Sequence, residues 1–305
     1  MIEAPWVPAV RAAAGHIRRR VLEHTLRNGG GYMSQACSAA EILATLYLHA
    51  MNLPQLAAPL RPRPFPGTPG PTNPGYFTGA EFNGLAGPDQ DRFFLSPAHY
   101  ALVVYATLIE TGRMHADALD EFNRDGSSVE MIGAEHSPGM EVTAGSLGQG
   151  LSQAAGIAMA RRLRGETGRT WVMLSDGELQ IGQTWEALQA MVFHRLDGMV
   201  LVVDVNGQQC DGTIESVMTI EPLAARLVAF GCRVARVDGH DPVALAAALA
   251  TRPAVRPDGR PLVVLADTDP CRGLTPLRAN APKLHYLRFT TEAQRQTYQS
   301  ALEAM

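Results

Sequence analysis

Residues 171–178 read WVMLSDGE, a continuous apolar run that passes directly into Ser-Asp-Gly-Glu. Residues 199–207 read MVLVVDVNG, a second apolar run that also passes into polar residues and glycine. A helical pattern at residues 183–194 separates the two runs. Continuously apolar strands that alternate with helices are typical of a parallel sheet covered on both faces. The two segments therefore predict parallel strands whose carboxyl ends carry polar side chains.

The same alternation extends over the rest of the chain. We expect further helices at residues 8–26, 38–50, 97–111, 146–164, 222–230 and 242–250, and further strands at residues 233–237 and 262–266. Ser38 followed by Glu41 indicates a capping box, and Ser96-Pro97 indicates an N-cap with proline at the first helical position. The predicted fold class is α/β, with one domain over residues 1–305 in which a doubly wound, mostly parallel sheet carries helices on both faces.

A proline-rich segment interrupts this pattern. Eight of the chain's 21 prolines lie between Pro54 and Pro74. Proline is excluded from helix interiors and central strands, so we expect an insert without regular structure at about residues 54–90. Long irregular segments in compact domains are often lids or subunit contacts.

Composition argues against several classes of protein. The formal net charge of −4 gives no electrostatic reason to expect nucleic acid or a membrane as partner. The four cysteines include no C-x-x-C pair, which argues against a disulfide framework or a zinc site and favours a reducing compartment. Without a signal-peptide pattern or a bilayer-spanning apolar stretch, the expected location is cytoplasmic. The basic cluster at residues 18–20 is expected to be a solvated helix face.

Two positions at the expected strand ends indicate a metal site. Asp176 and Asn206 are 30 residues apart (206 − 176), about one βαβ unit, so neighbouring strand ends can bring them together. Carboxylate and amide oxygens suit Mg²⁺, which takes its other ligands from water and substrate phosphates. Gly177 leaves room for a phosphate to approach the backbone. Either Asp-Gly or Asn-Gly alone would be an ordinary turn.

A glycine-rich turn and three histidines are further candidates. Residues 145–150 read GSLGQG, which is not the G-x-G-x-x-G of nicotinamide-binding folds, and could serve a ligand or only a tight turn. His99 is expected on a first helical turn, where the helix dipole favours an anion. His136 lies in a loop flanked by glycine and proline, and His285 precedes an aromatic cluster. Each histidine taken alone is more often structural than catalytic.

Several segments of the chain, taken in their order along the sequence, resemble the N-terminal half of a transketolase. The family's thiamine diphosphate motif is Gly-Asp-Gly followed one βαβ unit later by Asn, matched here by residues 175–177 and Asn206. The matching segments are residues 38–43, 92–96 with His99, 138–141, 145–150, 175–180, 185–187 and 203–207. The resemblance implies the thiamine-diphosphate-binding fold, in the form of its diphosphate-binding domain, over nearly the whole chain.

The resemblance also implies roles for individual residues. Asp176 and Asn206, with the Gln208 carbonyl, would bind Mg²⁺, or Ca²⁺ or Mn²⁺ in its place. Gly177 would contact the diphosphate. Gly145 and Leu147 would contact the aminopyrimidine. The remaining residues assigned to the cofactor-binding segments are Ser146, Ser175 and Glu178.

The resemblance also implies roles for the three histidines and for Glu186. His99 and His285 would contact cofactor and substrate, and His136 would contact the donor's hydroxyl groups. Glu186 would keep one position of the family's proton relay between sites.

Several positions depart from the family pattern. Ser175 replaces the glycine before the motif's aspartate, which is a small change. Tyr32 stands where the family has a substrate-channel histidine, and Ser34-Gln35 where it has a glycine pair. Ile181 replaces a relay glutamate. Cofactor binding is therefore expected to be intact, whereas the family's sugar specificity does not follow.

The resemblance implies a subunit of a split enzyme. In transketolases the pyrimidine-binding domain, with its catalytic glutamate and phosphate-binding arginines, lies beyond the half matched here. We expect this chain to pair with such a subunit in an α2β2 assembly, and to transfer a two-carbon ketol unit from a ketose or ketose phosphate to an aldehyde. Two alternatives stay open. One is an enzyme that decarboxylates a 2-oxo acid and passes the acyl unit to a carrier protein. The other is a non-catalytic cofactor-binding scaffold.

Overall fold

A five-stranded parallel sheet forms the centre of the structure, in the order β2-β3-β4-β8-β7. Its strands are β2 Arg92–Leu95, β3 Thr170–Ser175, β4 Met199–Val205, β8 Leu262–Asp267 and β7 Arg233–Asp238. The computed structural model describes residues 4–84, 87–250 and 259–305, so residues 85–86 of the expected insert lie outside the described residues. The predicted α/β fold with a parallel sheet is confirmed.

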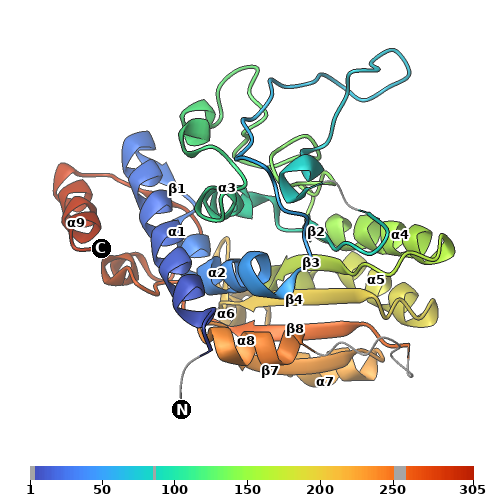
Figure 1. Ribbon diagram of the computed structural model, residues 1–305. Helices are drawn as coiled ribbons and strands as arrows, with labels where there is room; N and C mark the ends of the chain where they lie inside the picture. The colour runs from blue at the N-terminus through green and yellow to red at the C-terminus, as the bar shows by residue number, and fades with distance from the viewer. Residues whose placement is uncertain (1–3, 85–86, 251–258) are drawn as a thin grey trace.

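Helices cover both faces of this sheet (Figure 1). One face carries α1 (Val7–Asn28), α2 (Met33–Thr45), α3 (Ala101–Glu110) and α8 (Pro242–Leu249). The other face carries α4 (Gln149–Leu163), α5 (Gly182–Phe193) and α7 (Leu223–Ala229). Each face has its own hydrophobic core, which explains why the central strands are apolar at every position.

Alternate side chains of each strand point into opposite cores, as the two-residue period of a strand requires. In β3, Trp171 and Met173 belong to the core that includes α1, α2 and α3, whereas Val172 and Leu174 belong to the core that includes α4 and α5. The register between β3 and β4 places Ser175 opposite Asp204. Both strands therefore end at the same edge of the sheet, and the polar residues that follow them become neighbours.

Shorter elements complete the chain. They are β1 (Gly30–Gly31), β5 (Gln208–Gln209), β6 (Gly212–Thr213), α6 (Ile214–Met218), β9 (Leu287–Arg288), α9 (Glu292–Glu303), a π turn at Leu46–Ala50, and 3₁₀ turns at Gly79–Asn83, Ala98–Tyr100, Ala116–Glu121, Asp176–Gln180 and Thr275–Asn280. β1 pairs with β9, which brings the residues before β9 back to the start of α2. No helix within the described ranges is both long and apolar enough to cross a bilayer.

The proline-rich insert packs against the segment between α3 and α4. Within its described part, regular structure is limited to the turn at Gly79–Asn83 and isolated bridges from Leu60 to Met114 and from Pro64 to Ser127. The Tyr76 hydroxyl donates to Glu135 Oε1 at 2.6 Å. The segment is irregular over this described part, and it is fastened to the loop that leads toward Gly145.

The predicted capping box at Ser38 and Glu41 is wrong. α2 begins at Met33, so both residues lie inside the helix, and every residue of α2 is buried. The Ser38 hydroxyl donates to Asp204 Oδ2, while Glu41 binds Arg18 and His240. Both side chains instead interact with residues that are distant in the sequence, and a local sequence pattern does not predict such partners.

Two related expectations also need correction. Arg18 is buried and paired with Glu41, so residues 18–20 are not simply a solvated face. Ser96 is not the N-cap of α3, which begins at Ala101; the Ser96 hydroxyl donates to Glu178 Oε1 at 2.6 Å. His99 consequently lies in the preceding 3₁₀ turn, not in the first turn of an α-helix. The next helix, α4, begins at Gln149, three residues after the expected start at Ser146.

Two glycines of α4 should respond oppositely to the same substitution. A Cβ on Gly150 would lie 2.8 Å from Ser96 Cα, whereas a Cβ on Gly156 would meet nothing within 4 Å. We predict that Gly150→Ala destabilises the chain by about 1–3 kcal/mol, because the backbone of the Ser96 turn must shift. Gly156→Ala should stabilise it by about 0.5–1 kcal/mol. Urea unfolding measures both, and equal effects would contradict this packing.

Candidate functional site

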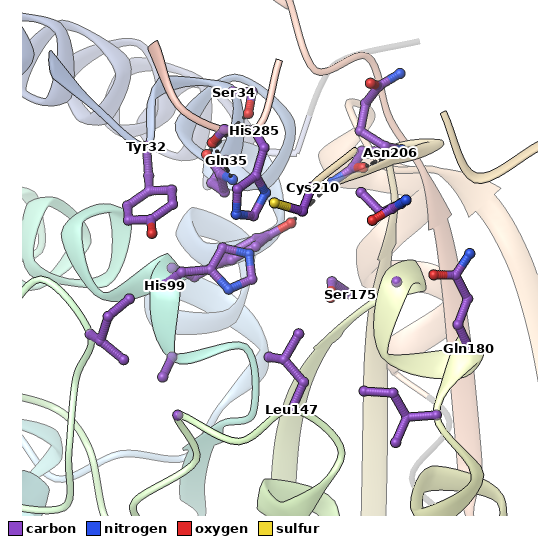
Figure 2. A pocket seen from close by; sticks show the side chains of 18 residues that line it. Tyr32, Ser34, Gln35, His99, Leu147, Ser175, Gln180, Asn206, Cys210 and His285 are labelled. Carbon is purple, nitrogen blue, oxygen red and sulfur yellow. Dashed lines mark hydrogen bonds between the residues drawn. The ribbon is translucent and has the colours of Figure 1, made fainter. Parts of the chain in front are cut away.

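A pocket of about 370 Å³ opens at the carboxyl edge of the sheet (Figure 2). It lies where β3 and β4 end, which is where ligands bind in open parallel sheets. The turn after β2, the loop before α4 and the start of α2 close its other sides. The residues that line it are Tyr32, Ser34, Gln35, Ala98, His99, Tyr100, Ile132, Gly145, Leu147, Ser175, Gly177, Gln180, Ile181, Asn206, Gln208, Gln209, Cys210 and His285.

Two histidines from distant parts of the sequence meet in this pocket. The rings of His99 and His285 lie with centroids 4.8 Å apart, and Tyr32 lies 5.5 and 5.4 Å from them (Figure 2). Burial, with His285 nearby, lowers the pKa of His99 to about 3, and burial also lowers the pKa of His285. Both imidazoles are therefore neutral near pH 7, each with one donor and one acceptor nitrogen.

The start of α2 holds His285 in place. The Gln35 side chain donates through Nε2 to the His285 carbonyl at 3.1 Å, and the Ser34 hydroxyl donates to Gln35 Oε1 at 3.0 Å. Tyr32 also packs edge-on against Tyr286, with ring centroids 4.9 Å apart. The three positions that depart from the family's substrate-channel pattern thus form one wall of the pocket together with His285.

Asp176 and Asn206 meet at the floor of the pocket. Asp176 is buried, and its carboxylate accepts hydrogen bonds from the amides of Gly177 at 2.9 Å and Gly207 at 2.7 Å. The Asn206 side-chain oxygen accepts from the Gln208 amide at 2.9 Å. Burial, and secondarily the nearby carboxylate of Asp204, raises the pKa of Asp176 to about 8. Near pH 7 the Asp176 carboxyl is therefore mostly protonated in the chain without a bound cation.

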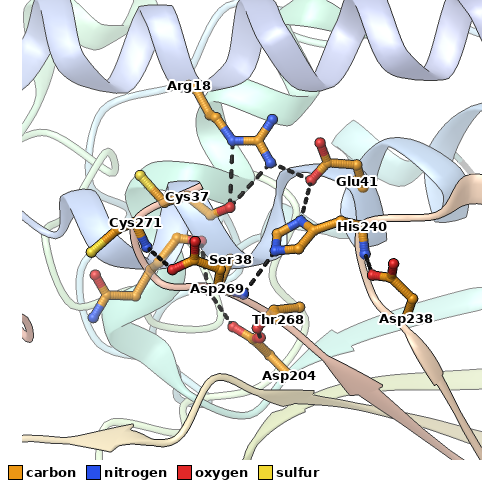
Figure 3. A network of polar contacts seen from close by, with 11 residues as sticks. Arg18, Cys37, Ser38, Glu41, Asp204, Asp238, His240, Thr268, Asp269 and Cys271 are labelled. Carbon is orange, nitrogen blue, oxygen red and sulfur yellow. Dashed lines mark hydrogen bonds and ion pairs between the residues drawn. The ribbon is translucent and has the colours of Figure 1, made fainter. Parts of the chain in front are cut away.

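Asp204 is the buried residue that organises this floor. Its Oδ2 accepts from the Tyr100 hydroxyl at 2.8 Å and from Asn206 Nδ2 at 3.1 Å. Ser38 of α2 and Thr268 after β8 also donate to it (Figure 3). Burial raises the pKa of Asp204. The sequence prediction gave Asp204 no role, although it stands two residues before Asn206 in the same strand end.

A second polar network lies behind Ser38 and links α1, α2 and the loops after β7 and β8 (Figure 3). The Asp269 amide donates to His240 Nε2 at 2.8 Å, so that nitrogen carries no proton, and Nδ1 donates to Glu41 Oε2 at 3.0 Å. Glu41 also pairs with Arg18. The network therefore fixes the backbone next to Thr268, whose hydroxyl contacts Asp204.

Comparison with known proteins agrees with this geometry. The sequence matches the thiamine diphosphate binding domain of transketolase over residues 83–285. The chain belongs to this transketolase family. It is 36% identical over 275 residues to a transketolase family protein of Sinorhizobium fredii, with 88% of each chain covered.

Other matches include a relative of similar length and a longer solved structure. A 6-deoxy-6-sulfo-D-fructose transketolase subunit of a Clostridium strain is 31% identical, with 84% of this chain and 82% of that one covered. The solved transketolase of Campylobacter jejuni has the same fold, with a TM-score of 0.73 at 20% identity over 97% of this chain. This chain spans only 46% of that transketolase.

The pocket contains most of the residues expected from the transketolase family. His99, Gly145, Leu147, Ser175, Gly177, Asn206, Gln208 and His285 line it, and Asp176 lies directly beneath. Ser146 is exposed in the same turn as Leu147 but does not line the pocket. Glu178 is completely buried behind it.

Two expected residues lie elsewhere. His136 is buried against the insert, where its ring packs edge-on with Phe65, and its Nε2 lies 3.2 Å from Glu130 Oε2 without hydrogen-bond geometry. Glu186 is exposed on α5 and does not line the pocket. Within this chain, neither side chain is placed to touch a ligand beside His99.

The neutral state of His99 predicts a pH effect on stability. The pKa of His99 is lowered from 6.5 to about 3, so below pH 6.5 the unfolded chain takes up a proton that the folded chain does not. Stability should therefore fall as the pH drops from 6.5 toward 3. We predict that His99→Gln reduces this slope by up to about 1.4 kcal/mol per pH unit. Urea unfolding between pH 7 and 5 measures the slope, and an unchanged slope would show that folding does not lower the pKa of His99.

Proposed function

We propose that this chain is the diphosphate-binding subunit of a thiamine-diphosphate-dependent transketolase. The enzyme would move a two-carbon ketol unit from a ketose or ketose phosphate to an aldehyde. The observation that carries the proposal is the meeting of Asp176 and Asn206 at strand ends, beneath a pocket that contains His99, Leu147 and His285. When bound, the cofactor supplies the nucleophilic carbon and accepts the electron pair. The residues of this chain would bind and orient it.

Asp176, Asn206 and the Gln208 carbonyl would hold the metal of the diphosphate. The fit rests on the buried Asp176 carboxyl, whose raised pKa a divalent cation would bring down by favouring the ionised form. The side-chain Oε1 of Gln208, a different atom from the proposed carbonyl ligand, is also buried without a partner in the described structure. No group of three or more His, Cys, Asp or Glu side chains is placed to bind a metal in the described ranges. Phosphate oxygens and water would therefore complete the shell, as Mg²⁺ prefers and as Ca²⁺ or Mn²⁺ would allow.

Glycines at the two turns would let the cofactor approach the backbone. A Cβ on Gly177 would meet only Gln209 Cβ, at 3.7 Å, so the space before this residue is open to a diphosphate oxygen. Gly145 and Leu147 line the opposite side of the pocket, where the aminopyrimidine would lie, with Ser146 exposed beside them. Ser175 would contribute backbone at the end of β3.

His99 and His285 would bind sugar hydroxyl groups and the diphosphate side of the cofactor. A neutral imidazole has one donor and one acceptor nitrogen, which suits hydroxyl groups because they can both donate and accept hydrogen bonds. None of the described residues that line the pocket is lysine or arginine. A phosphate on the sugar would therefore have to be bound by the partner subunit.

The partner would carry the pyrimidine-binding domain and would cover α4 and α5. Leu163 at the end of α4 and Phe193 at the end of α5 are both 80% exposed, which is unusual for large apolar side chains. Glu186 is exposed on the same helix as Phe193 and would face the partner. Two copies of each subunit would give an α2β2 assembly with closed two-fold symmetry.

An activity assay of the separate and mixed subunits tests this proposal. The chain alone, with thiamine diphosphate, Mg²⁺ and a panel of ketoses and aldehydes, should show no ketol transfer, because the pocket described above would supply only the diphosphate side of the site. Addition of a transketolase C-terminal subunit from the same source should restore transfer. Full turnover by the chain alone would contradict the split assembly, and no transfer by an α2β2 complex that binds the cofactor would contradict the reaction.

A further inference from the structure

Three loops that are distant in sequence supply the walls of the pocket. The turn after β2 carries His99, the turn before α4 carries Leu147, and the turn after β3 carries Gly177. The β-sheet ladder fixes Ser175 at the end of β3, but His99, Leu147 and Gly177 lie outside the strands. Some other contact must hold the loops at their mutual distances.

A single carboxylate contacts all three loops. Glu178 Oε1 accepts from the Ser96 hydroxyl at 2.6 Å and from the Gly148 amide at 3.1 Å. Glu178 Oε2 accepts from the Ser175 amide at 3.2 Å. The side chain is buried, and its own carbonyl accepts from the Thr184 hydroxyl at 2.8 Å. Each donor lies one to three residues from a residue that lines the pocket.

The chemistry of these contacts requires a carboxylate. All three donors point at acceptor oxygens, and only an ionised carboxylate offers acceptors on both of its terminal atoms. In glutamine one oxygen becomes an amide nitrogen, which would face a donor and leave it unpaired. A buried donor without a partner is costly, so the affected loop would move.

We propose that Glu178 is a positioning residue that clamps the His99, Leu147 and Gly177 loops around the pocket and so sets its affinity for the cofactor. The inference rests on the proposed function only for the identity of that cofactor. It assigns Glu178 a role different from direct cofactor contact, since the side chain is completely buried behind the pocket. The clamp itself is a property of the chain without ligand.

Asp91 provides a matched control at the other end of the same strands. It is also buried and also accepts three hydrogen bonds, from the Asn52 amide at 2.9 Å, the Arg169 amide at 2.8 Å and Trp171 Nε1 at 2.8 Å. These donors lie at the amino ends of β2 and β3, away from the pocket. Asp91→Asn therefore removes a buried three-donor carboxylate without touching the loops of the site.

Hydrogen exchange on the ligand-free chain tests the clamp directly. Glu178→Gln should speed exchange of the Gly148 or Ser175 amide by about tenfold or more, because one of them loses its acceptor. Asp91→Asn should instead speed exchange of the Asn52 or Arg169 amide, because one of them loses its acceptor. Unchanged exchange at both Gly148 and Ser175 in Glu178→Gln would overturn the proposal. If that variant does not fold, Ser96→Ala removes one donor and keeps the carboxylate, and it should loosen the His99 turn alone.

Thiamine diphosphate binding in Mg²⁺, measured by calorimetry on the chain with its partner subunit, tests the consequence. Glu178→Gln should weaken binding by about tenfold or more, whereas Asp91→Asn should stay within about twofold despite a similar loss of thermal stability. Equal weakening by both variants would overturn the positioning role. Absence of binding by the wild-type pair would refute the proposed function instead, while the exchange result would still decide whether the clamp exists.

Discussion

Burial of carboxylates at the carboxyl edge of the sheet is the constraint on which the rest of the site depends. Asp176 and Asp204 follow or end neighbouring strands, and burial raises the pKa of both. Such groups are tolerated only when hydrogen-bond donors surround them. Those donors come from α2, from the turn after β2 and from the loops after β4 and β8. The hydrogen bonds that these two carboxyl groups accept therefore bring together the segments that form the pocket.

The same arrangement explains the pKa values of the ionisable groups around the pocket. Its floor holds the Asp176 carboxyl, which accepts from two backbone amides and whose pKa is raised by burial, and its walls hold imidazoles whose pKa values are lowered by burial. A divalent cation with a diphosphate would complement the floor, and sugar hydroxyl groups would complement the walls. The pocket thus has two different environments, with Tyr32 and Gln35 on the same side as the imidazoles.

Much of the fold and part of the site could be predicted from the sequence. The strands at 171–174 and 199–203 were predictable because residues buried on both faces leave a continuous apolar run. The pairing of Asp176 with Asn206 followed from the geometry of a βαβ unit. The roles of Ser38 and Ser96 could not be predicted, because their hydroxyls bond to Asp204 and Glu178, more than 80 residues away along the chain.

The burial of Arg18 was missed for the same reason. Local pattern made it part of an exposed basic stripe, whereas Glu41 and the Cys37 carbonyl accept from its guanidinium in the packed structure. The position of His136 also depends on long-range packing, since the ring of Phe65 that it packs against lies 71 residues earlier in the insert (136 − 65 = 71). Sequence spacing identifies strand ends well and identifies the partners of buried polar groups poorly.

The central claim is that the Asp176 floor binds thiamine diphosphate through a divalent metal. Calorimetry of the chain with its partner subunit, titrated with thiamine diphosphate in Mg²⁺ and again in excess chelator, tests it most directly. We predict binding in Mg²⁺, its loss in chelator, and weakening by about a hundredfold or more in Asp176→Ala, since a first ligand of the metal is removed. Unchanged affinity in chelator or in Asp176→Ala would contradict the account.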